Sequence, residues 1–285
     1  MIRFNKVAII GVGLMGGSIG LAVKKRRVAG EVIGVFRHAS TLRRALKRRA
    51  VDRGTLSIEE GVKDADLIII ATPVYSIPPL AAKVMRYAKK GAMITDAGST
   101  KKWLVGEVER KLGSSRRVFF VGSHPMAGSE HAGVEFARDN LLADAPCIVT
   151  RTPKTDRRAL GAVINFWSAL GARVAIMDPS AHDRNISFAS HLPHLVAFGV
   201  IGAVPEKYFL YSAEGFKDTT RVASSDPRMW TDIFLTNRKD VLRSARMFKG
   251  YLGEIVRVVK NGDSKKLFRL LKSAKMKRDK FFYGK

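Results

Sequence analysis

Residues 6–16 read KVAIIGVGLMG, an apolar run followed by a glycine-rich turn. The run has the composition of a buried strand, and an apolar helical pattern follows the turn. In such a unit Gly11 permits the tight turn, Gly13 lets the backbone approach a pyrophosphate, and Gly16 lets helix and strand pack closely. The start of the helix offers free N–H groups to phosphates. The residues predicted to contact a dinucleotide are Gly11, Gly13, Leu14, Met15 and Gly16.

Short apolar runs alternate with helical patterns on both sides of this turn. Further strands are expected at 32–36, 66–71, 92–96, 118–121, 146–150 and 173–177. Helices are expected at 40–50, with Ser40 as the N-cap, and at 155–170. Alternating strands and helices are typical of a parallel sheet covered by helices on both faces. We therefore predict a Rossmann-type α/β domain with a doubly wound, mainly parallel sheet.

The pattern changes after Asp178. Long helical patterns cover residues 181–203, 238–260 and 264–280, and strand patterns nearly vanish. This predicts a dinucleotide-binding domain at 1–178 and an all-helical substrate and dimerisation domain at 179–285. A helical domain of about a hundred residues buries little surface alone, so a homodimer is expected.

Composition places the chain in a broad class. Of its 285 residues, 46% are hydrophobic, which is enough for a substantial core. No apolar run approaches the roughly 20 residues that span a bilayer, and the N-terminus lacks a signal-peptide pattern. The single cysteine, Cys147, fits a reducing compartment. We expect a soluble, cytoplasmic protein without a membrane segment.

The net charge of +26 comes from 51 Lys and Arg against 25 Asp and Glu. Such a surface attracts anions, including small acids, phosphorylated cofactors and nucleic acids. The basic residues are spread along the chain, and no nucleic-acid-binding motif accompanies them. Attraction of small anions is favoured, and nucleic-acid binding without catalysis is kept as an alternative.

The choice of cofactor depends on the end of the second strand. An acidic residue there binds the ribose 2′-hydroxyl of NAD, whereas an Arg accommodates the 2′-phosphate of NADP. The chain has Arg37 and no carboxylate at this place, which favours NADP over NAD. Thr72 follows another strand and is expected near the nicotinamide, or in a simple strand-terminating turn.

Two polar loops follow strands that end at the same edge of the sheet, at 96–101 and 122–130. Oxidation of an alcohol by hydride transfer needs a base for the hydroxyl proton, and histidine suits this role near neutral pH. We predict that His124, in a loop flanked by Pro and Gly, is that base. No spacing of Asp, Glu, His and Cys indicates a metal site.

Together with the glycine-rich turn, these loops give the sequence a specific resemblance to a known family. In order and spacing, Gly11–Gly16, Asp96–Lys101, Ser123–Glu130, Ser190–His194 and Gly215–Arg221 resemble the motifs of the prephenate/arogenate dehydrogenase family. The resemblance covers essentially the whole chain. It implies oxidative decarboxylation of prephenate to 4-hydroxyphenylpyruvate with hydride transfer to a nicotinamide, on the route to tyrosine.

The resemblance also implies roles for particular residues. His124 accepts the proton of the ring hydroxyl, Ser99 orients this histidine and touches the hydroxyl, and Arg221 binds a substrate carboxylate. The remaining pocket residues by resemblance are His194, Ser190, Glu130 and Asp218. Without the family pattern, at least one of His191 and His194 is equally well explained as a core histidine. Arg221 is then an ordinary surface residue, and its pairing with Asp218 is a local salt bridge of small value.

Several alternatives stay open at this point. Arogenate could replace prephenate, and Glu214 bears on this because a carboxylate facing the pocket would attract the arogenate ammonium. A hydroxy-acid dehydrogenase of the same architecture, which would use a Lys of the helical domain as its acid–base group, is less favoured because the motifs Ser123–Glu130 and Ser190–His194 argue against it.

Overall fold

The computed structural model describes residues 4–113, 117–129 and 131–284. The chain divides into two compact units, Met1–Arg238 and Lys239–Lys285. The first unit holds the sheets and the helices up to Thr236, and the second holds most of the last two helices. The predicted domain boundary at 178 coincides with the change from strands to helices and stays a prediction about domain organisation.

The main sheet has six parallel strands in the order β3-β2-β1-β4-β5-β6. The order reverses between β1 and β4, and a ligand crevice forms at such a reversal, beyond the carboxyl ends of the strands. The Rossmann-type fold predicted from the sequence is confirmed. The strands are β1 (Phe4–Ile10), β2 (Ala29–Val35), β3 (Arg53–Thr55), β4 (Leu67–Ile70), β5 (Met93–Asp96) and β6 (Phe119–Val121).

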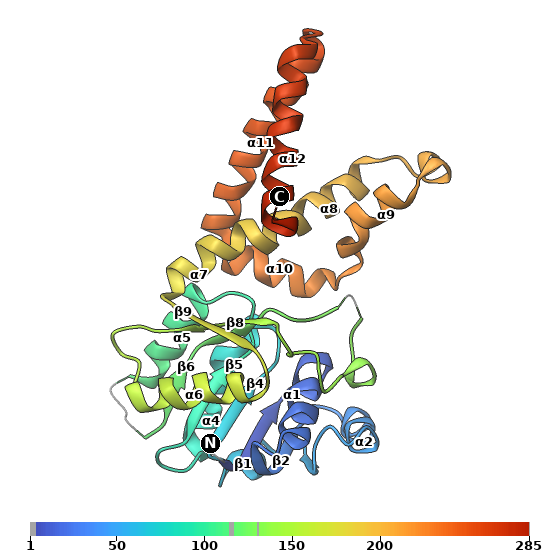
Figure 1. The fold of residues 1–285 in the computed structure, drawn as a ribbon. Coiled ribbons are helices and arrows are strands. Elements are labelled where there is room, and N and C mark those ends of the chain that lie inside the picture. Colours follow the sequence, from blue (N-terminus) through green and yellow to red (C-terminus); the bar gives the residue numbers. More distant parts are fainter. Residues whose placement is uncertain (1–3, 114–116, 130, 285) are drawn as a thin grey trace. The chain divides into compact units, whose positions relative to one another are not determined.

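Helices cover both faces of this sheet (Figure 1). On one face, Ile19 of α1 and Phe166 and Trp167 of α6 are fully or almost fully buried in one core. On the other face, Val84 of α4 and Leu104 of α5 belong to a second core. Each buried side chain of this size contributes about 1.5–3 kcal/mol. The helices are α1 (Leu14–Lys25), α2 (Ala39–Lys47), α3 (Ile58–Val62), α4 (Ile77–Tyr87), α5 (Lys102–Leu112) and α6 (Arg157–Ala169).

A second sheet has three strands, β7 (Ser123–Pro125), β8 (Pro146–Thr150) and β9 (Arg173–Met177). β7 runs antiparallel to β8, and His124 lies opposite Ile148. The sequence predicted β8 and β9 but assigned residues 122–130 to a loop, which is wrong for 123–125. Three residues between Gly122 and Met126 carry no strand pattern of their own, and their pairing comes from β8, far along the chain.

The helical part of the first unit begins at the Asp178 carboxylate, which accepts the N–H groups of Ser180 and Ala181 at 2.9 Å. The predicted helix 181–203 is interrupted by a π-turn at Ser187–His191. Pro193 explains the interruption, because it cannot donate to the carbonyl four residues earlier. The helices are α7 (Pro179–Ile186), α8 (Leu192–Ala203), α9 (Glu214–Thr220) and α10 (Pro227–Thr236), with short 3-10 turns at Glu206–Tyr211 and Arg221–Ser224.

Within the described residues, one helical run, Pro179–Ala203, is long and apolar enough to cross a membrane by length and composition alone. Its mean hydropathy is 1.4, and 22% of the window is buried inside the chain. Polar residues such as His182 and Asp183 lie within this run, so it does not stand out as an unbroken apolar stretch in the sequence. A helix face of this kind also suits a second protein chain.

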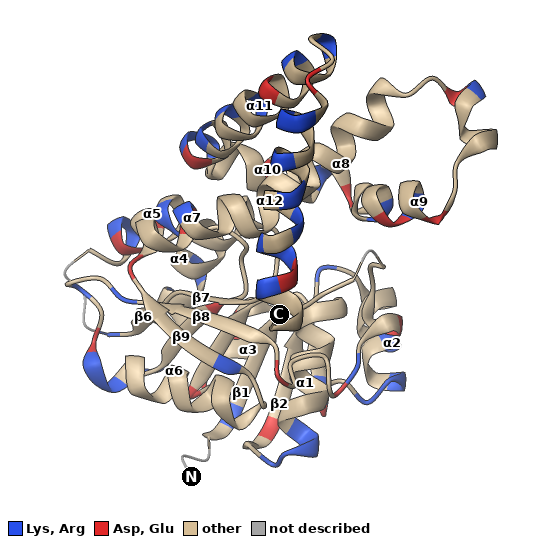
Figure 2. Cartoon of the chain, turned by 45° about the horizontal axis from the view of Figure 1, so that its top comes forward, with Lys and Arg blue, Asp and Glu red and all other residues tan. Residues whose placement is uncertain are grey.

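The second unit is a pair of helices, formed by most of α11 (Arg238–Lys260) and by α12 (Ser264–Tyr283), close to the predicted ranges. The Asp263 carboxylate caps α12 by accepting the N–H of Lys266 at 2.9 Å. The Tyr251 hydroxyl donates to the carbonyl of Leu270 at 3.4 Å. Lys and Arg lie along α12, and others lie on α2 and α5 of the first unit (Figure 2).

Candidate active site

The glycine-rich turn between β1 and α1 has the shape that a dinucleotide needs. Gly11 has φ +89°, a conformation that other residues rarely adopt. A Cβ on Gly16 would lie 2.2 Å from the carbonyl oxygen of Gly11, so only glycine fits there. A Cβ on Gly13 would have no neighbour within 4 Å, which leaves open space above the first turn of α1. The backbone of Gly13, Leu14 and Met15 therefore lies where pyrophosphate oxygens can accept its N–H groups.

Two further residues predicted to bind the cofactor lie at the same edge of the sheet. Arg37 is exposed just beyond β2, and its Nε donates to Nε2 of His38 at 2.9 Å. Thr72 follows β4, with its methyl group close to Gly11. The predicted capping role of Ser40 is wrong, because α2 begins at Ala39 and His38 occupies the N-cap position. Ser40 therefore lies inside the first turn.

The predicted base, His124, is buried, with 8% of its surface exposed. Its Nδ1 lies 2.9 Å from Nε2 of His182 on α7. Burial, together with the neighbouring His182 and Lys101, lowers the pKa of His124 well below 6.5. The imidazole is therefore neutral at neutral pH and can accept a proton.

The loop that carries Ser99 is held by a buried ion pair. Nζ of Lys101 lies 2.7 Å from Oδ2 of Asp96, and neither side chain is exposed. Lys101 also donates to the carbonyl oxygen of Gly98 at 2.6 Å. The other carboxylate oxygen of Asp96 accepts the N–H of Ser123 at 3.0 Å. One carboxylate thus links the Ser99 loop to the strand that carries His124.

A cavity of about 320 Å³ lies in the first unit and brings most of the predicted site together. Its volume suits a small ring-bearing acid. Glu130 lies outside the described residues. Asp218 does not line this cavity, although Arg221 does. The predicted residues that line it are Ser99, His124, Ser190, His194 and Arg221.

Aromatic rings form one wall of this cavity. The rings of His194 and Trp230 stack with centroids 3.7 Å apart. His194 Nδ1 lies 2.9 Å from the carbonyl oxygen of Ser190, so this nitrogen carries the proton. His191 lines the same cavity, and among the described residues its Nε2 and Nε1 of Trp230 are buried without a hydrogen-bond partner.

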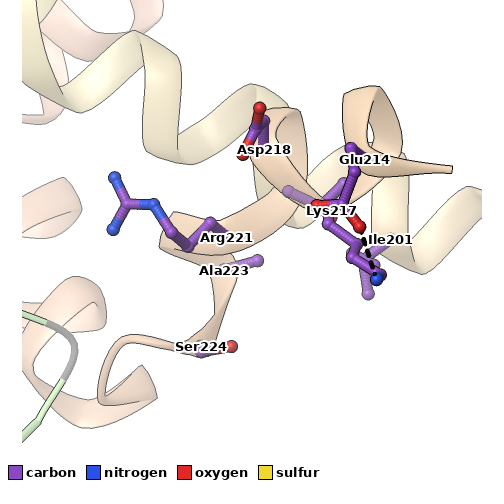
Figure 3. A pocket seen from close by; sticks show the side chains of 8 residues that line it. Ile201, Glu214, Lys217, Asp218, Arg221, Ala223 and Ser224 are labelled. Atoms are coloured by element: carbon purple, nitrogen blue, oxygen red, sulfur yellow. Dashed lines mark hydrogen bonds and ion pairs between the residues drawn. The ribbon is translucent and has the colours of Figure 1, made fainter.

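Asp218 and Glu214 line a neighbouring cavity, which shares Arg221 with the first (Figure 3). The Glu214 carboxylate pairs with Nζ of Lys217 at 2.8 Å, and its side chain is 81% exposed. Figure 3 shows the Arg221 side chain pointing away from this pair. The Glu214 side chain therefore faces solvent, and the structure does not give it the pocket-facing position in which it would attract the arogenate ammonium. No group of three or more potential metal ligands occurs in the described parts of the chain.

Two residues near the base were not predicted to act in the site. His182 contacts His124, and Asp183 accepts from His182. Neither residue belongs to one of the five sequence motifs that resemble the family. The available signal was their position in the first helix after the sheet, where α7 lies close to α5 and to β8.

Comparison with known proteins agrees with this arrangement. Residues 19–176 match the nucleotide-binding domain of prephenate dehydrogenase, and 178–273 match its dimerization domain. A prephenate dehydrogenase of Bacillus subtilis strain 168 is 36% identical over 282 residues, covering 96% of this chain and 76% of the relative.

Solved structures agree as well. Prephenate dehydrogenase from Aquifex aeolicus, in complex with hydroxyphenyl propionate and NAD+, superposes with a TM-score of 0.90 and 35% identity, covering 97% of this chain and 98% of the other. Synechocystis arogenate dehydrogenase has a TM-score of 0.81 and 27% identity, covering 97% and 99%. With the glycine cradle and the His124 cavity in one unit, these matches show that the chain is an oxidoreductase of the prephenate dehydrogenase family.

Proposed function

We propose that the chain oxidises prephenate to 4-hydroxyphenylpyruvate and CO2, with transfer of a hydride to a nicotinamide. The observation that carries this proposal is that the neutral imidazole of His124 and the guanidinium of Arg221 line the same cavity. A base is needed at the ring hydroxyl and a cation at a carboxylate. The substrate carries both groups.

His124 provides the base. Its Nδ1 is engaged with His182, which leaves Nε2 to accept the proton of the C4 hydroxyl. Ser99 lines the same cavity and can hydrogen-bond that hydroxyl. The bound cofactor supplies the acceptor for the hydride that leaves C4. Loss of the ring carboxyl as CO2 returns its electron pair to the ring, which becomes aromatic.

Arg221 provides the clamp. A guanidinium offers two parallel N–H donors to a carboxylate, a geometry that fixes orientation as well as charge. Trp230 and His194 form a flat wall against which a six-membered ring can lie. Together these contacts would hold C4 in place for hydride transfer.

NADP is the proposed cofactor, with NAD as the alternative. Arg37 supports NADP, because it stands beyond β2 where the 2′-phosphate would lie and no carboxylate competes there. The structure of the A. aeolicus relative is a complex with NAD+, and this supports NAD as the alternative cofactor.

A homodimer is proposed, with residues 179–285 as the substrate and dimerisation domain. In the second unit, Val256, Phe268 and Leu271 are each more than half exposed. Apolar side chains exposed on a helix pair are stabilised when a second copy covers them.

The experiment that tests the proposed function is an assay of nicotinamide reduction with purified protein. Prephenate and arogenate are each supplied with NADP and with NAD. We expect the highest kcat/KM for prephenate with NADP. Turnover of arogenate alone would establish the arogenate alternative, and no reduction with any pair would contradict both.

A further inference from the structure

A chain of buried hydrogen bonds leads away from His124. Nδ1 of His124 lies 2.9 Å from Nε2 of His182, and Nδ1 of His182 lies 2.8 Å from Oδ1 of Asp183. His124 is 8% exposed, His182 is fully buried and Asp183 is 1% exposed. Water therefore does not compete for these bonds.

Asp183 is held by the backbone of the loop that follows Ser99. Its Oδ1 accepts the N–H of Lys101 at 2.7 Å, and its Oδ2 accepts the N–H of Lys102 at 2.9 Å. Its own carbonyl accepts Nδ2 of Asn237 at 2.9 Å. The carboxylate thus has a fixed position and accepts from every group around it.

The chemistry of these groups determines where the protons lie. Burial raises the pKa of Asp183, and the N–H groups of Lys101 and Lys102 oppose this because they donate to both oxygens of its carboxylate. A carboxylate held by these donors only accepts, so Nδ1 of His182 carries a proton. Burial lowers the pKa of His182 to about 2, so this ring carries one proton at neutral pH and its Nε2 has a lone pair. The hydrogen bond to that lone pair must come from Nδ1–H of His124. Nε2 of His124 is then left unprotonated.

We propose that His182 and Asp183 are positioning residues that hold His124 as its Nδ1–H tautomer, so that Nε2 is the base. This inference rests on the proposed function. In the catalytic triad of serine proteases a carboxylate fixes the tautomer of the base directly. Here a second imidazole stands between the carboxylate and the base. This chain of hydrogen bonds from Asp183 through His182 to His124, here called the relay, neither adds a proton to the site nor removes one. It only determines which nitrogen of His124 is the acceptor.

The direct test is 15N NMR of the full chain labelled at histidine, with signals assigned by their loss in His124→Asn and His182→Gln. Wild-type His124 and His182 should each have a protonated Nδ1 and an unprotonated Nε2 at neutral pH. In Asp183→Asn the amide nitrogen replaces one of the two oxygens that accept the N–H groups of Lys101 and Lys102. Where this nitrogen faces His182 it donates to Nδ1, which reverses both hydrogen bonds and moves the proton of His124 to Nε2. A wild-type His124 protonated at Nε2 would overturn the proposal.

Kinetics give a second, independent readout. His182→Gln retains an amide oxygen near the position of Nε2, whereas His182→Leu removes the acceptor. We expect a loss in kcat of about 100-fold or more for His182→Leu and Asp183→Asn, within the range for loss of a general base. His182→Gln should retain most of the activity, and the KM for prephenate should change little in all three. Equal kcat values for the Gln and Leu variants would contradict the relay.

A further variant serves as the control for a general loss of stability. Trp167→Phe removes another fully buried ring N–H in the same unit, in the core under α6. It should lower stability without altering kcat or the His124 tautomer. If wild-type protein reduces no nicotinamide, the proposed function fails while the NMR result still decides the tautomer. If wild type is active and Asp183→Asn changes neither tautomer nor kcat, only the relay fails.

Discussion

Nζ of Lys101 lies 2.7 Å from Oδ2 of Asp96, and both side chains are fully buried. The pair is the centre of a loop that also carries Ser99, and the second oxygen of Asp96 holds the strand of His124. Burial raises the pKa of Asp96, although Lys101 opposes this. The ion pair therefore connects the stability of the fold with the geometry of the site.

Lys101→Met should lower the free energy of unfolding by about 3–5 kcal/mol, because it leaves a buried carboxylate without its cation. Denaturant unfolding measures this. Adding Asp96→Asn removes the uncompensated charge while keeping an acceptor for Ser123, so the double variant should recover part of the loss. A loss below about 1 kcal/mol for the single variant would show that the pair is not a buried ion pair.

Arg221→Ala should raise the KM for prephenate by about 10- to 100-fold, the equivalent of a charge-assisted hydrogen bond. The Kd of the cofactor should stay the same. Arg221→Lys is the matched variant, because it keeps the charge but loses the two parallel N–H donors. Its KM for prephenate should lie between those of wild type and Arg221→Ala. Steady-state kinetics with both variants measure this, and an unchanged KM for Arg221→Ala would remove Arg221 from the carboxylate site.

Arg37→Asp should shift cofactor preference from NADP toward NAD. A carboxylate repels the 2′-phosphate and can accept the ribose 2′-hydroxyl. The ratio of kcat/KM for NADP to that for NAD should fall by about 100-fold, which matches the loss of a charged hydrogen bond plus repulsion. If wild type already prefers NAD, or if the ratio does not move, Arg37 does not read the 2′-phosphate.

Buried histidines should make the fold sensitive to mild acid. Burial lowers the pKa of His191 from 6.5 to about 4. The unfolded chain therefore binds a proton below about pH 6.5 that the folded chain does not, and stability falls as the pH falls. At pH 5.5 this amounts to about 1.4 kcal/mol for one histidine.

His191→Leu removes this contribution. Between pH 7.5 and 5.5 the variant should lose about 1 kcal/mol less stability than wild type, whatever its stability at pH 7.5. Urea unfolding at the two pH values gives the comparison. Identical losses in the two proteins would mean that His191 takes up a proton in the folded state as readily as in the unfolded one.

Sequence patterns predicted the nucleotide-binding half well because its signals are local. The apolar run before Gly11 and the spacing to Gly16 define a strand, a turn and a helix without help from distant residues. The same holds for β8 and α6, whose apolar residues have the expected periods. Five of the six strands of this sheet were predicted, and β3 was missed because its three residues, Arg53–Thr55, form no apolar run.

The rest depends on contacts between distant residues. β7 exists because β8 pairs with it, and Lys101 is one basic side chain among 51 until the fold buries it against Asp96. His182 meets His124 across 58 positions of sequence. Composition and spacing contain no information on such pairs. Residues of the cavity such as His194 and Arg221 were named from the family resemblance, and the network behind His124 was not predicted.

The most direct test of the central claim is the stoichiometry of the reaction in wild type and in His124→Asn. With prephenate and NADP, wild type should release one CO2 for each nicotinamide reduced and yield 4-hydroxyphenylpyruvate, as the balanced reaction requires. His124→Asn should be slower by about 100- to 10,000-fold with an unchanged cofactor Kd, because only the base is lost. Nicotinamide reduction without CO2, or near wild-type turnover by His124→Asn, would contradict the account.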